Sequence, residues 1–591
     1  MGKYANISKE KNLIYKVCVF MKRISIFLML FLLAFSFSIG CSKRTKGKAG
    51  MSFERIKQSR QIVFDLAEND YDLIISGTKN SPPNLFSFNQ LGSQAGFALV
   101  SADVNGDNID DIIIGAPTSE GPLDRSFKTG WVYIFFGGKS TASTELFAKK
   151  AGVMMFGGKS NGGALLGNSL AAADINGDGI EDVIIGAPKG NVPRSRRYNI
   201  ANERPDAGII YVVFGSKSLS GVKNLVKKAD VTFFGAGQGD LFGYSIATGD
   251  INGDGIADII SGAPEADGYK NKHNDAGEAY LIYGRKQFPE KIDMAKSWDS
   301  RFYGYAGTAK TGLLKNNFPN KTGFAVSAAD INGDGFDDLI IASPFSDELN
   351  KKRRDAGAVS VVFGKKTLPK RIRLSRKADV TIFGARKEDY AGYSLATGDI
   401  NGDGKDDIII GAPSGANNVN VHDEKVGRIY GIFGREQFSK KIDLRKKVDF
   451  FIKEKYFMAG EMFGPTFIIG QTGYPGHTVS SGDVNGDGID DIIIGKPGAD
   501  ILARDETGAG DVYIIYGNKS LNGRHRLRQK ANVTIFGVSR RDSTGSALST
   551  GDVNGDGVAD IIIGAPGAKI KSSGKKKRRT GKVYVIHGKK S

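Results

Sequence analysis

One nine-residue acidic sequence occurs seven times in this chain of 591 residues. The copy at 174–182 reads DINGDGIED, and successive copies start 69 to 84 residues apart. The other copies begin at Asp103, Asp250, Asp330, Asp399, Asp483 and Asp552. A recurring period of this length is typical of repeat architectures, so we expect one large repeat domain rather than several ordinary domains.

Each complete repeat contains four short, β-rich runs bounded by Gly, Pro or Asp. In the third repeat they read GYSIATGDI (243–251), DIISGAP (258–264), GEAYLIYG (277–284) and SRFYGYAG (300–307). Runs of this kind are typical of strands, and four strands per period indicate the blade of a β-propeller. The sequence therefore predicts an all-β, seven-bladed β-propeller over residues 71–591.

The composition of the four runs predicts their order within a blade. The first is rich in Ala, Ser, Thr and Gly, which suits the innermost strand, where blades crowd the axis. The second and third are dense in Ile, Val, Tyr and Phe, which suits strands buried on both faces. The fourth, such as DVTFFGA at 230–236, is expected to form the outer edge.

The two ends of the repeat region predict how the ring closes. The last repeat stops after its third run, KVYVIHGKKS (582–591), so one strand is missing there. An unmatched run, YDLIISG (71–77), precedes the first repeat. We expect this run to complete the seventh blade, because closure removes an exposed sheet edge.

The acidic sequence follows the pattern Asp-x-Asn-x-Asp-Gly-h-x-Asp, where h is usually apolar. Positions 1, 3, 5 and 9 offer side-chain oxygens, and position 7 offers its carbonyl. Hard oxygen donors from a compact loop are the ligands that Ca²⁺ prefers. The sequence therefore predicts about seven Ca²⁺ sites. The predicted ligands are Asp103, Asn105, Asp107, Ile109, Asp111, Asp174, Asn176, Asp178, Ile180, Asp182, Asp250, Asn252, Asp254, Ile256, Asp258, Asp330, Asn332, Asp334, Phe336, Asp338, Asp399, Asn401, Asp403, Lys405, Asp407, Asp483, Asn485, Asp487, Ile489, Asp491, Asp552, Asn554, Asp556, Val558 and Asp560.

The acidic sequence has two other interpretations, an EF-hand and a simple turn. It is not an EF-hand, because position 12 is not Glu in any copy, as at Ile114 or Ile185, and both flanks read as strands. The Asp and Asn residues could instead only stabilise turns by bonding their own backbone. All seven copies keep four side-chain ligands, whereas a turn needs one such residue, and this favours calcium. We expect the ions to be structural and to join strand one to strand two.

The stretch FGYSIATGDINGDGIADIISGAP (242–264) resembles an FG-GAP repeat, the blade unit of the integrin α-chain propeller. The GAP triplet recurs at Gly115, Gly186, Gly262, Gly411 and Gly564. The resemblance covers roughly residues 71–591 and implies a seven-bladed propeller with calcium between strands one and two. Integrin α chains carry such loops in only some blades, whereas this chain has them in all seven. The resemblance therefore supports the fold and the ion sites, and not integrin-like heterodimers.

Residues 1–40 differ from the repeats. A basic start at Met21-Lys22-Arg23 is followed by a largely apolar run at 24–39 and by small residues before Cys41. This order is typical of a secretory signal peptide, and the small residues resemble a bacterial lipobox. The resemblance implies lipidation of Cys41 and a location at the bacterial outer membrane or cell surface. The alternatives are an ordinary signal peptide or an uncleaved anchor. Residues 41–70 are expected to be a tether.

Charge suggests where a ligand binds. The formal net charge is +18, and a basic surface favours anionic partners. Antiparallel topology places the connections between strands two and three opposite the acidic loops, and several are basic. We expect that face to contact a polysaccharide or an acidic protein; the alternative is that these are solvated insertions. The candidate ligand-face residues are Arg194, Arg196, Arg197, Lys351, Lys352, Arg353, Arg354, Lys575, Lys576, Lys577, Arg578 and Arg579.

The sequence has no pattern typical of an enzyme. None of its five histidines pairs with another at a metal-ligand spacing, and neither G-x-S-x-G nor a P-loop occurs. We therefore expect a non-enzymatic, calcium-stabilised, membrane-anchored binding or adhesion protein outside the cytoplasm, with a polysaccharide or protein ligand and no nucleic-acid partner. The alternatives are a polysaccharide-active enzyme that uses loop carboxylates, and a purely structural envelope scaffold.

Overall fold

The computed structural model describes residues 62–69, 71–76, 94–120, 128–139, 144–147, 150–158, 163–271, 275–304, 320–347, 353–413, 426–455, 477–499, 508–570 and 578–590. All of them belong to one compact unit, 60–591. The predicted signal peptide (1–40) and Cys41 lie outside the described residues. No helix in the described part of the chain has the length and apolar character needed to cross a bilayer.

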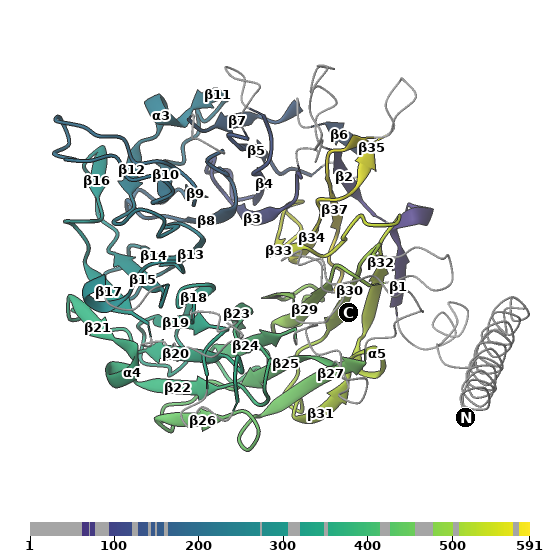
Figure 1. The fold of residues 1–591 in the computed structure, drawn as a ribbon. Coiled ribbons are helices and arrows are strands. Elements are labelled where there is room, and N and C mark those ends of the chain that lie inside the picture. The colour runs from purple at the N-terminus through teal and green to yellow at the C-terminus, as the bar shows by residue number, and fades with distance from the viewer. Residues whose placement is uncertain are drawn as a thin grey trace, which may run out of the picture. The chain divides into compact units, whose positions relative to one another are not determined.

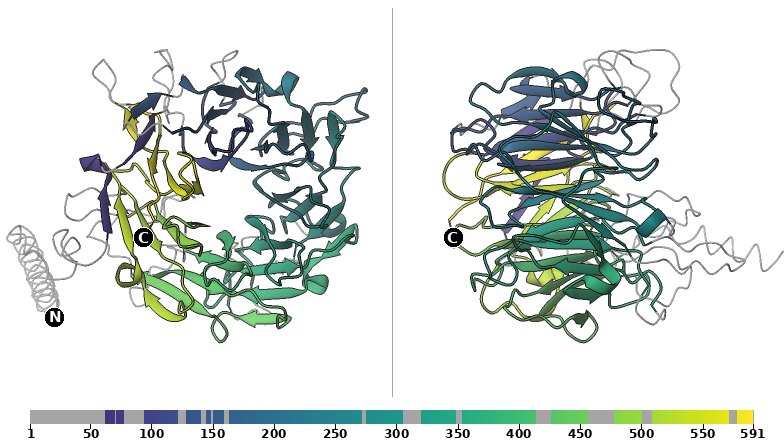
Figure 2. Two further views of the ribbon diagram at one scale, coloured as in Figure 1. Left: turned by 180° about the vertical axis from the view of Figure 1, so that it is seen from behind. Right: turned by 90° about the vertical axis from the view of Figure 1, so that its left-hand side faces the viewer.

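In the described chain, seven five-stranded sheets are arranged in a ring, which confirms the predicted seven-bladed propeller (Figures 1 and 2). Four strands of each blade are antiparallel neighbours, ordered from the axis outward. The first three blades contain β3 (Ala98–Ala102), β4 (Asp111–Ala116), β5 (Trp131–Phe135) and β7 (Val153–Phe156); β8 (Ser169–Ala173), β9 (Asp182–Ala187), β10 (Ile209–Val213) and β12 (Val231–Phe234); and β13 (Ser245–Gly249), β14 (Asp258–Ala263), β15 (Glu278–Ile282) and β17 (Ser300–Tyr303). The next three contain β18 (Val326–Ala329), β19 (Asp338–Ser343), β20 (Ala358–Val362) and β22 (Val380–Phe383); β23 (Ser394–Gly398), β24 (Asp407–Ala412), β25 (Val426–Ile432) and β27 (Phe450–Lys455); and β28 (Thr478–Gly482), β29 (Asp491–Lys496), β30 (Asp511–Ile515) and β32 (Val533–Phe536). Blade seven contains β33 (Ala547–Gly551), β34 (Asp560–Ala565), β37 (Lys582–Ile586) and β2 (Leu73–Ser76).

Each blade also has a fifth, outermost strand, so the expectation that strand four forms the outer edge was wrong. The fifth strand runs parallel to strand four and comes from the connection between strands three and four of the next blade. On blades one to five these strands are β11 (Gly221–Asn224), β16 (Lys291–Asp293), β21 (Arg371–Arg373), β26 (Lys441–Asp443) and β31 (Gly523–Arg526). Short helices follow three of them: α3 (Leu225–Lys228), α4 (Leu374–Lys377) and α5 (Leu527–Lys530). Each blade is therefore covered at its rim by its successor.

The ring is closed by two strands from the N-terminal segment. As predicted, β2 completes blade seven by pairing antiparallel with β37, and Ile75 lies opposite Val583. In addition, β1 (Ile62–Asp65) pairs parallel with β32 and supplies the fifth strand of blade six. The short helix η1 (Leu66–Glu68) joins them. The predicted tether, 41–70, was therefore too long, because residues 62–69 belong to the propeller.

Blade seven follows the same pattern: its fifth strand is β6 (Thr144–Phe147), which comes from the connection between strands three and four of blade one and pairs parallel with β2. A small hairpin of β35 (Lys569–Ile570) and β36 (Arg578–Arg579) lies in the connection between strands two and three of blade seven, and η3 (Tyr269–Asn271) lies in that of blade three.

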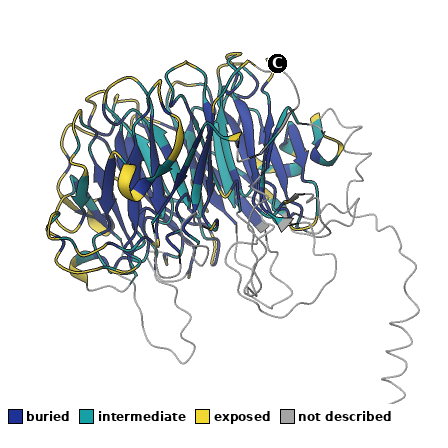
Figure 3. Cartoon of the chain, turned by 90° about the horizontal axis from the view of Figure 1, so that it is seen from above, coloured by how far each residue is buried: buried dark blue, intermediate teal, exposed yellow. Residues whose placement is uncertain are grey.

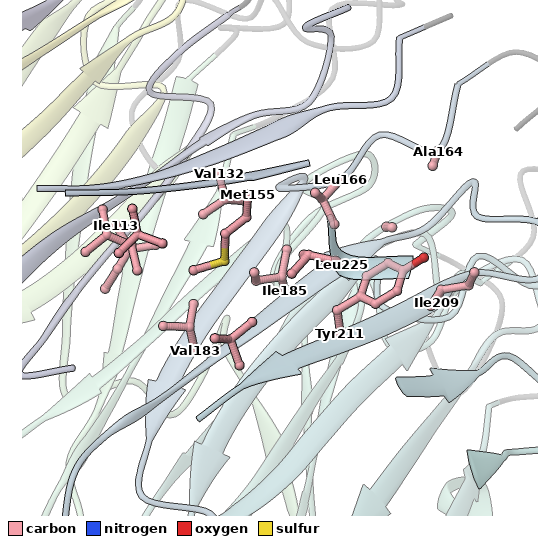
Figure 4. Packing of buried hydrophobic residues seen from close by; sticks show 14 of the residues in the cluster. Ile113, Val132, Met155, Ala164, Leu166, Val183, Ile185, Ile209, Tyr211 and Leu225 are labelled. Atoms are coloured by element: carbon pink, nitrogen blue, oxygen red, sulfur yellow. The ribbon is translucent and has the colours of Figure 1, made fainter. Parts of the chain in front are cut away.

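Apolar side chains fill the space between neighbouring blades. Seven buried clusters are present, one for each pair of neighbours around the ring. Between blades one and two, Ile113 and Met155 lie across from Val183 and Ile185 (Figure 4). Strands two and three are buried on both faces, as their composition predicts (Figure 3). The core is thus continuous around the ring.

Hydroxyl groups link the innermost strands around the axis. Ser101 Oγ donates to the Thr550 carbonyl, Thr550 Oγ1 to the Ser481 carbonyl and Ser481 Oγ to the Thr397 carbonyl, each at 2.6 Å. Strand one of each blade contacts strand one of both neighbours. This explains why small, hydroxyl-bearing residues occupy these strands.

The two faces of the ring differ in how uniform their connections are. On the face of the acidic loops, every 1–2 connection has the same length, as at 103–110 and 174–181, and the complete 3–4 connections share another length, as at 136–152 and 214–230. On the opposite face, the 2–3 connections range from the short one at 413–425 to the long one at 188–208. The 4–1 connection at 304–325 is more than twice as long as the one at 235–244. One face is therefore constant, and we call the other the variable face.

Candidate metal centres

The seven acidic loops are the 1–2 connections, and all share one backbone geometry. In the second loop, Asp174 Oδ1 accepts hydrogen bonds from the Gly177 and Asp178 amides at 2.6 and 3.1 Å, and Oδ2 accepts one from Gly179 at 2.7 Å. Asp178 Oδ1 accepts one from the Ile180 amide at 3.0 Å. The other six loops repeat these bonds. The first and fifth positions thus fold the loop tightly.

The ninth position of each loop is a buried aspartate at the start of strand two. Asp182 is fully buried and accepts hydrogen bonds from Asn176 Nδ2 at 3.2 Å and the Gly215 amide at 2.9 Å. Burial, with added repulsion from Asp178 and Asp174, raises the pKa of Asp182 to about 7. The equivalent aspartates have pKa values of about 7 or 8 for the same reasons. Each loop therefore holds a buried carboxylate whose charge is opposed by its surroundings.

The donor set fits a hard divalent cation. None of the loop aspartates forms an ion pair with a Lys or Arg in the described part of the chain. In the seventh loop Asn554 Nδ2 donates to Asp560 at 3.2 Å, and the buried Oδ1 of Asn554 has no hydrogen-bond partner. An oxygen-only set of three carboxylates and one amide, with an oxygen left unpaired, suits Ca²⁺.

Two observations keep calcium binding at the level of a prediction. Within the described residues, no three His, Cys, Asp or Glu side chains already converge as a metal-binding group. The bonds of the first aspartate are also those that the turn-only interpretation requires. That interpretation leaves unexplained why each loop brings two further carboxylates close to the first. A cation would remove this repulsion, and calcium binding stays the prediction to test.

The structure adds a role for the loops that the sequence did not suggest. The carbonyl at position 2 of each loop accepts a hydrogen bond from the next blade just after strand three, as between Ile175 and Arg285 at 2.9 Å. At position 8, Asp337 Oδ2 accepts a bond from the Asp250 amide in the preceding loop at 2.8 Å, and Glu181 does the same with Asp103. The loops therefore connect neighbouring blades as well as strands one and two.

The candidate ligand-face residues occupy different environments. Arg194, Arg196 and Arg197 are exposed in the 188–208 connection, and Arg197 lies 3.8 Å from Glu290, which directly precedes β16 at the outer edge of blade two. Arg579 donates to the Arg541 carbonyl. Lys351, Lys352, Lys575, Lys576 and Lys577 lie outside the described residues, and of Arg578 only the backbone is described.

Arg353 is structural, which corrects its assignment as a ligand contact, whereas Arg354 is exposed and its assignment stays a prediction. Arg353 is buried and Nη1 donates to the Gly384 and Ala385 carbonyls at 2.6 and 3.0 Å and to Asp443 at 2.9 Å. Arg354 pairs with Glu388. These partners lie far from residues 353 and 354 in the sequence, so the basic run at 351–354 does not reveal them.

Substitution Arg353→Ala is expected to destabilise the propeller rather than weaken ligand binding. It leaves two carbonyls and Asp443 without their buried donor, and breaking such a buried pair costs about 3–5 kcal/mol. The free energy of unfolding, measured by denaturant titration, tests this. Arg194→Ala on the same face is the matched exposed control and should leave stability unchanged; equal stability of the two variants would contradict the assignment.

The repeats of the ring match a known family. A family model described as FG-GAP repeat matches residues 95–124, 166–213, 242–282, 322–362, 391–430, 475–515 and 544–586. Each matched segment falls within one blade and includes its acidic loop.

Similar proteins include a phospholipase and an integrin. The chain is 25% identical over 496 residues to human phosphatidylinositol-glycan-specific phospholipase D, covering 79% of this chain and 50% of that protein. It is 28% identical over 313 residues to integrin alpha pat-2 of Caenorhabditis briggsae, covering 49% and 23%. It thus spans half or less of these relatives. Among solved structures, the V. cholerae biofilm matrix protein Bap1 aligns at 13% identity with a TM-score of 0.32, covering 87% of this chain and 90% of that one.

Proposed function

Because the chain is a seven-bladed propeller of FG-GAP repeats, we propose that it is a calcium-stabilised binding protein that holds a polysaccharide or protein ligand on its variable face. Integrins are named among its relatives, which supports a role of the binding or adhesion type.

The contrast between the two faces carries the proposal. The connections of the constant face keep their lengths from blade to blade, whereas those of the variable face lengthen and shorten. Binding residues are concentrated on loops that a rigid scaffold positions. The loops of the variable face can therefore change, and with them the ligand that is recognised, without altering the ring. Exposed residues such as Arg194 lie in these loops.

The constant face has the complementary role of holding the ring together. Positions 1, 3, 5 and 9 would hold the ion through their side chains, and position 7 through its carbonyl. A bound Ca²⁺ supplies the positive charge that three carboxylates of each loop share. Asp182 and its equivalents begin strand two, so an ion bound to the loop would also be bound to this strand of the blade. The ions are proposed to be structural and not to contact ligand.

From the N-terminal sequence, we propose that the protein lies outside the cytoplasm and is attached to a membrane. In residues 21–40 a basic start is followed by an apolar run and then by small residues, an order typical of a secretory signal peptide. Lipid on Cys41 would anchor the chain. The proposed role includes no catalysis. Release of reducing ends from a bound polysaccharide would identify an enzyme instead.

Exchange of one variable loop for a shorter one from the same face tests the proposal. The long connection at 188–208 is replaced by the connection at 264–277. A glycan array with the full chain, with and without chelator, is expected to show calcium-dependent binding that the exchange weakens or abolishes. The thermal transition, measured in parallel, should persist. Binding unchanged by this exchange and by the equivalent exchange at 566–581 would contradict a ligand site on the variable face.

A further inference from the structure

The positive charge of the propeller is concentrated on part of its outer rim. We define a rim segment as the stretch of chain that ends directly before strand four of a blade and contains the fifth strand of the preceding blade. The rim segments are 58–72, 138–152, 216–230, 285–299, 365–379, 435–449 and 518–532.

Three consecutive rim segments carry most of this charge. Segment 365–379 contains seven Lys or Arg and one acidic residue, 435–449 contains six and three, and 518–532 contains five and none. Segment 285–299, by contrast, contains four basic and three acidic residues, and 58–72 contains one and four. The three basic segments form what we call the basic arc.

The basic arc is continuous in space. Its fifth strands, β21, β26 and β31, lie on blades three, four and five, which are consecutive in the ring (Figure 1). The helices α4 and α5 of two segments lie at the same outer edge (Figure 1). The arc therefore follows the curved outer wall over three blades.

The charges of the arc face solvent. Fifteen of its eighteen Lys and Arg residues are exposed, against two exposed acidic residues, Asp379 and Glu436. Some cations already have partners: Arg435 pairs with Asp449, and Arg445 with Asp443. Others do not.

Four lysines in two of the three segments of the arc are available to a partner. Lys366, Lys370, Lys440 and Lys446 are exposed, and their side chains form no ion pair within the described part of the chain. Segments 216–230 and 285–299, on blades one and two, have only five exposed cations between them. The charge is thus a local feature of the arc and not a property of every blade.

We propose that the basic arc binds a flexible acidic polysaccharide. A concentration of one sign of charge attracts polyanions and raises their association rate. A flexible chain can follow a convex wall and contact three blades at once, whereas a flat bilayer meets such a wall only along a narrow line. Nucleic acid is disfavoured, because single strands require aromatic stacking platforms. In the described arc Phe438 is the one Phe, Tyr or Trp, and Arg435 covers it. This surface is separate from the ligand site proposed on the variable face.

Two charge-matched variants test the proposal. The arc variant carries K366E, K370E, K440E and K446E; the control variant carries K150E, K227E, K228E and K286E on the other rim segments. Both change net charge equally, and all eight lysines are exposed. The probes are polygalacturonate, which presents carboxylates, and heparin, which presents sulfates, with neutral dextran as blank.

The arc variant is expected to bind both acidic polysaccharides about tenfold more weakly than the unmodified chain at low salt, since clustered charges act together. The control variant is expected to bind nearly as well as the unmodified chain, and short oligosaccharides less well than long ones. Equal losses in both variants would show that net charge alone is responsible. Preferential binding to anionic vesicles or duplex DNA would also overturn the proposal. The loop-exchange variant should retain this binding, so failure here is distinguishable from failure on the variable face.

Discussion

Dialysis against a calcium-specific chelator is expected to lower the free energy of unfolding of the propeller by about 10 kcal/mol. If each ion is held at ten times its dissociation constant, it contributes about 1.4 kcal/mol, and seven independent sites give about this total. The expected loss is as large as the stability of an ordinary domain. Thermal unfolding followed by circular dichroism, before and after chelation, measures it.

The structure explains why the loss should extend beyond the loops. Without a cation, each loop confronts a buried aspartate such as Asp182 with two neighbouring carboxylates. Each loop also accepts hydrogen bonds from the next blade, as at Ile175, or donates one to it, as at Asp250. Loosening of a loop therefore weakens the contact between blades as well as the turn.

Three measurements separate calcium binding from the turn-only interpretation. Elemental analysis should find about seven Ca²⁺ per chain, in line with the seven oxygen-donor loops. Returning Ca²⁺ should restore the transition, and D182N should remove one ion while the other loops keep theirs. An unchanged transition after chelation, with no metal in the protein, would favour loops held by their backbone hydrogen bonds alone.

The sequence predicted the blades because their signals are local and repeated. Strand two of each blade begins at the ninth position of an acidic loop, and its Ile-rich run reads as a buried strand. The unmatched run at 71–77 could be assigned to blade seven by counting strands, and its pairing with β37 is confirmed.

The fifth strands could not be recognised in the same way. Strands such as Lys291–Asp293 and Arg371–Arg373 are too short and polar to show an alternating pattern. Their pairing is set by the neighbouring blade, which sequence patterns within one repeat do not show. The partners of Arg353 were missed for a related reason, since Asp443 belongs to the next repeat. The basic run at 351–354 therefore misplaced one ligand contact, Arg353.

Deletion of residues 1–76 is expected to destabilise the ring by about 6 kcal/mol and to cause aggregation. The deletion removes β1 and β2, together with the buried side chains of Leu66, Ile74 and Ile75. Burial of each such side chain contributes about 2 kcal/mol. It also leaves β37 and β32 without their outer partners, and unpaired strand edges promote association between chains. Denaturant unfolding and light scattering measure the two effects.

A circular permutant is the matched control for this deletion. Linking residue 590 to residue 58 and opening the chain after Ser76 moves β1 and β2 to the C-terminus and keeps every residue from 58 to 76. Blade seven then has its four inner strands continuous in sequence, as blades one to six already do. Because β2 pairs with β37 in the native ring, the permutant should unfold at nearly the same temperature as the unmodified chain. If the deleted chain matched the permutant in stability and remained monomeric, the N-terminal strands would not be what closes the ring.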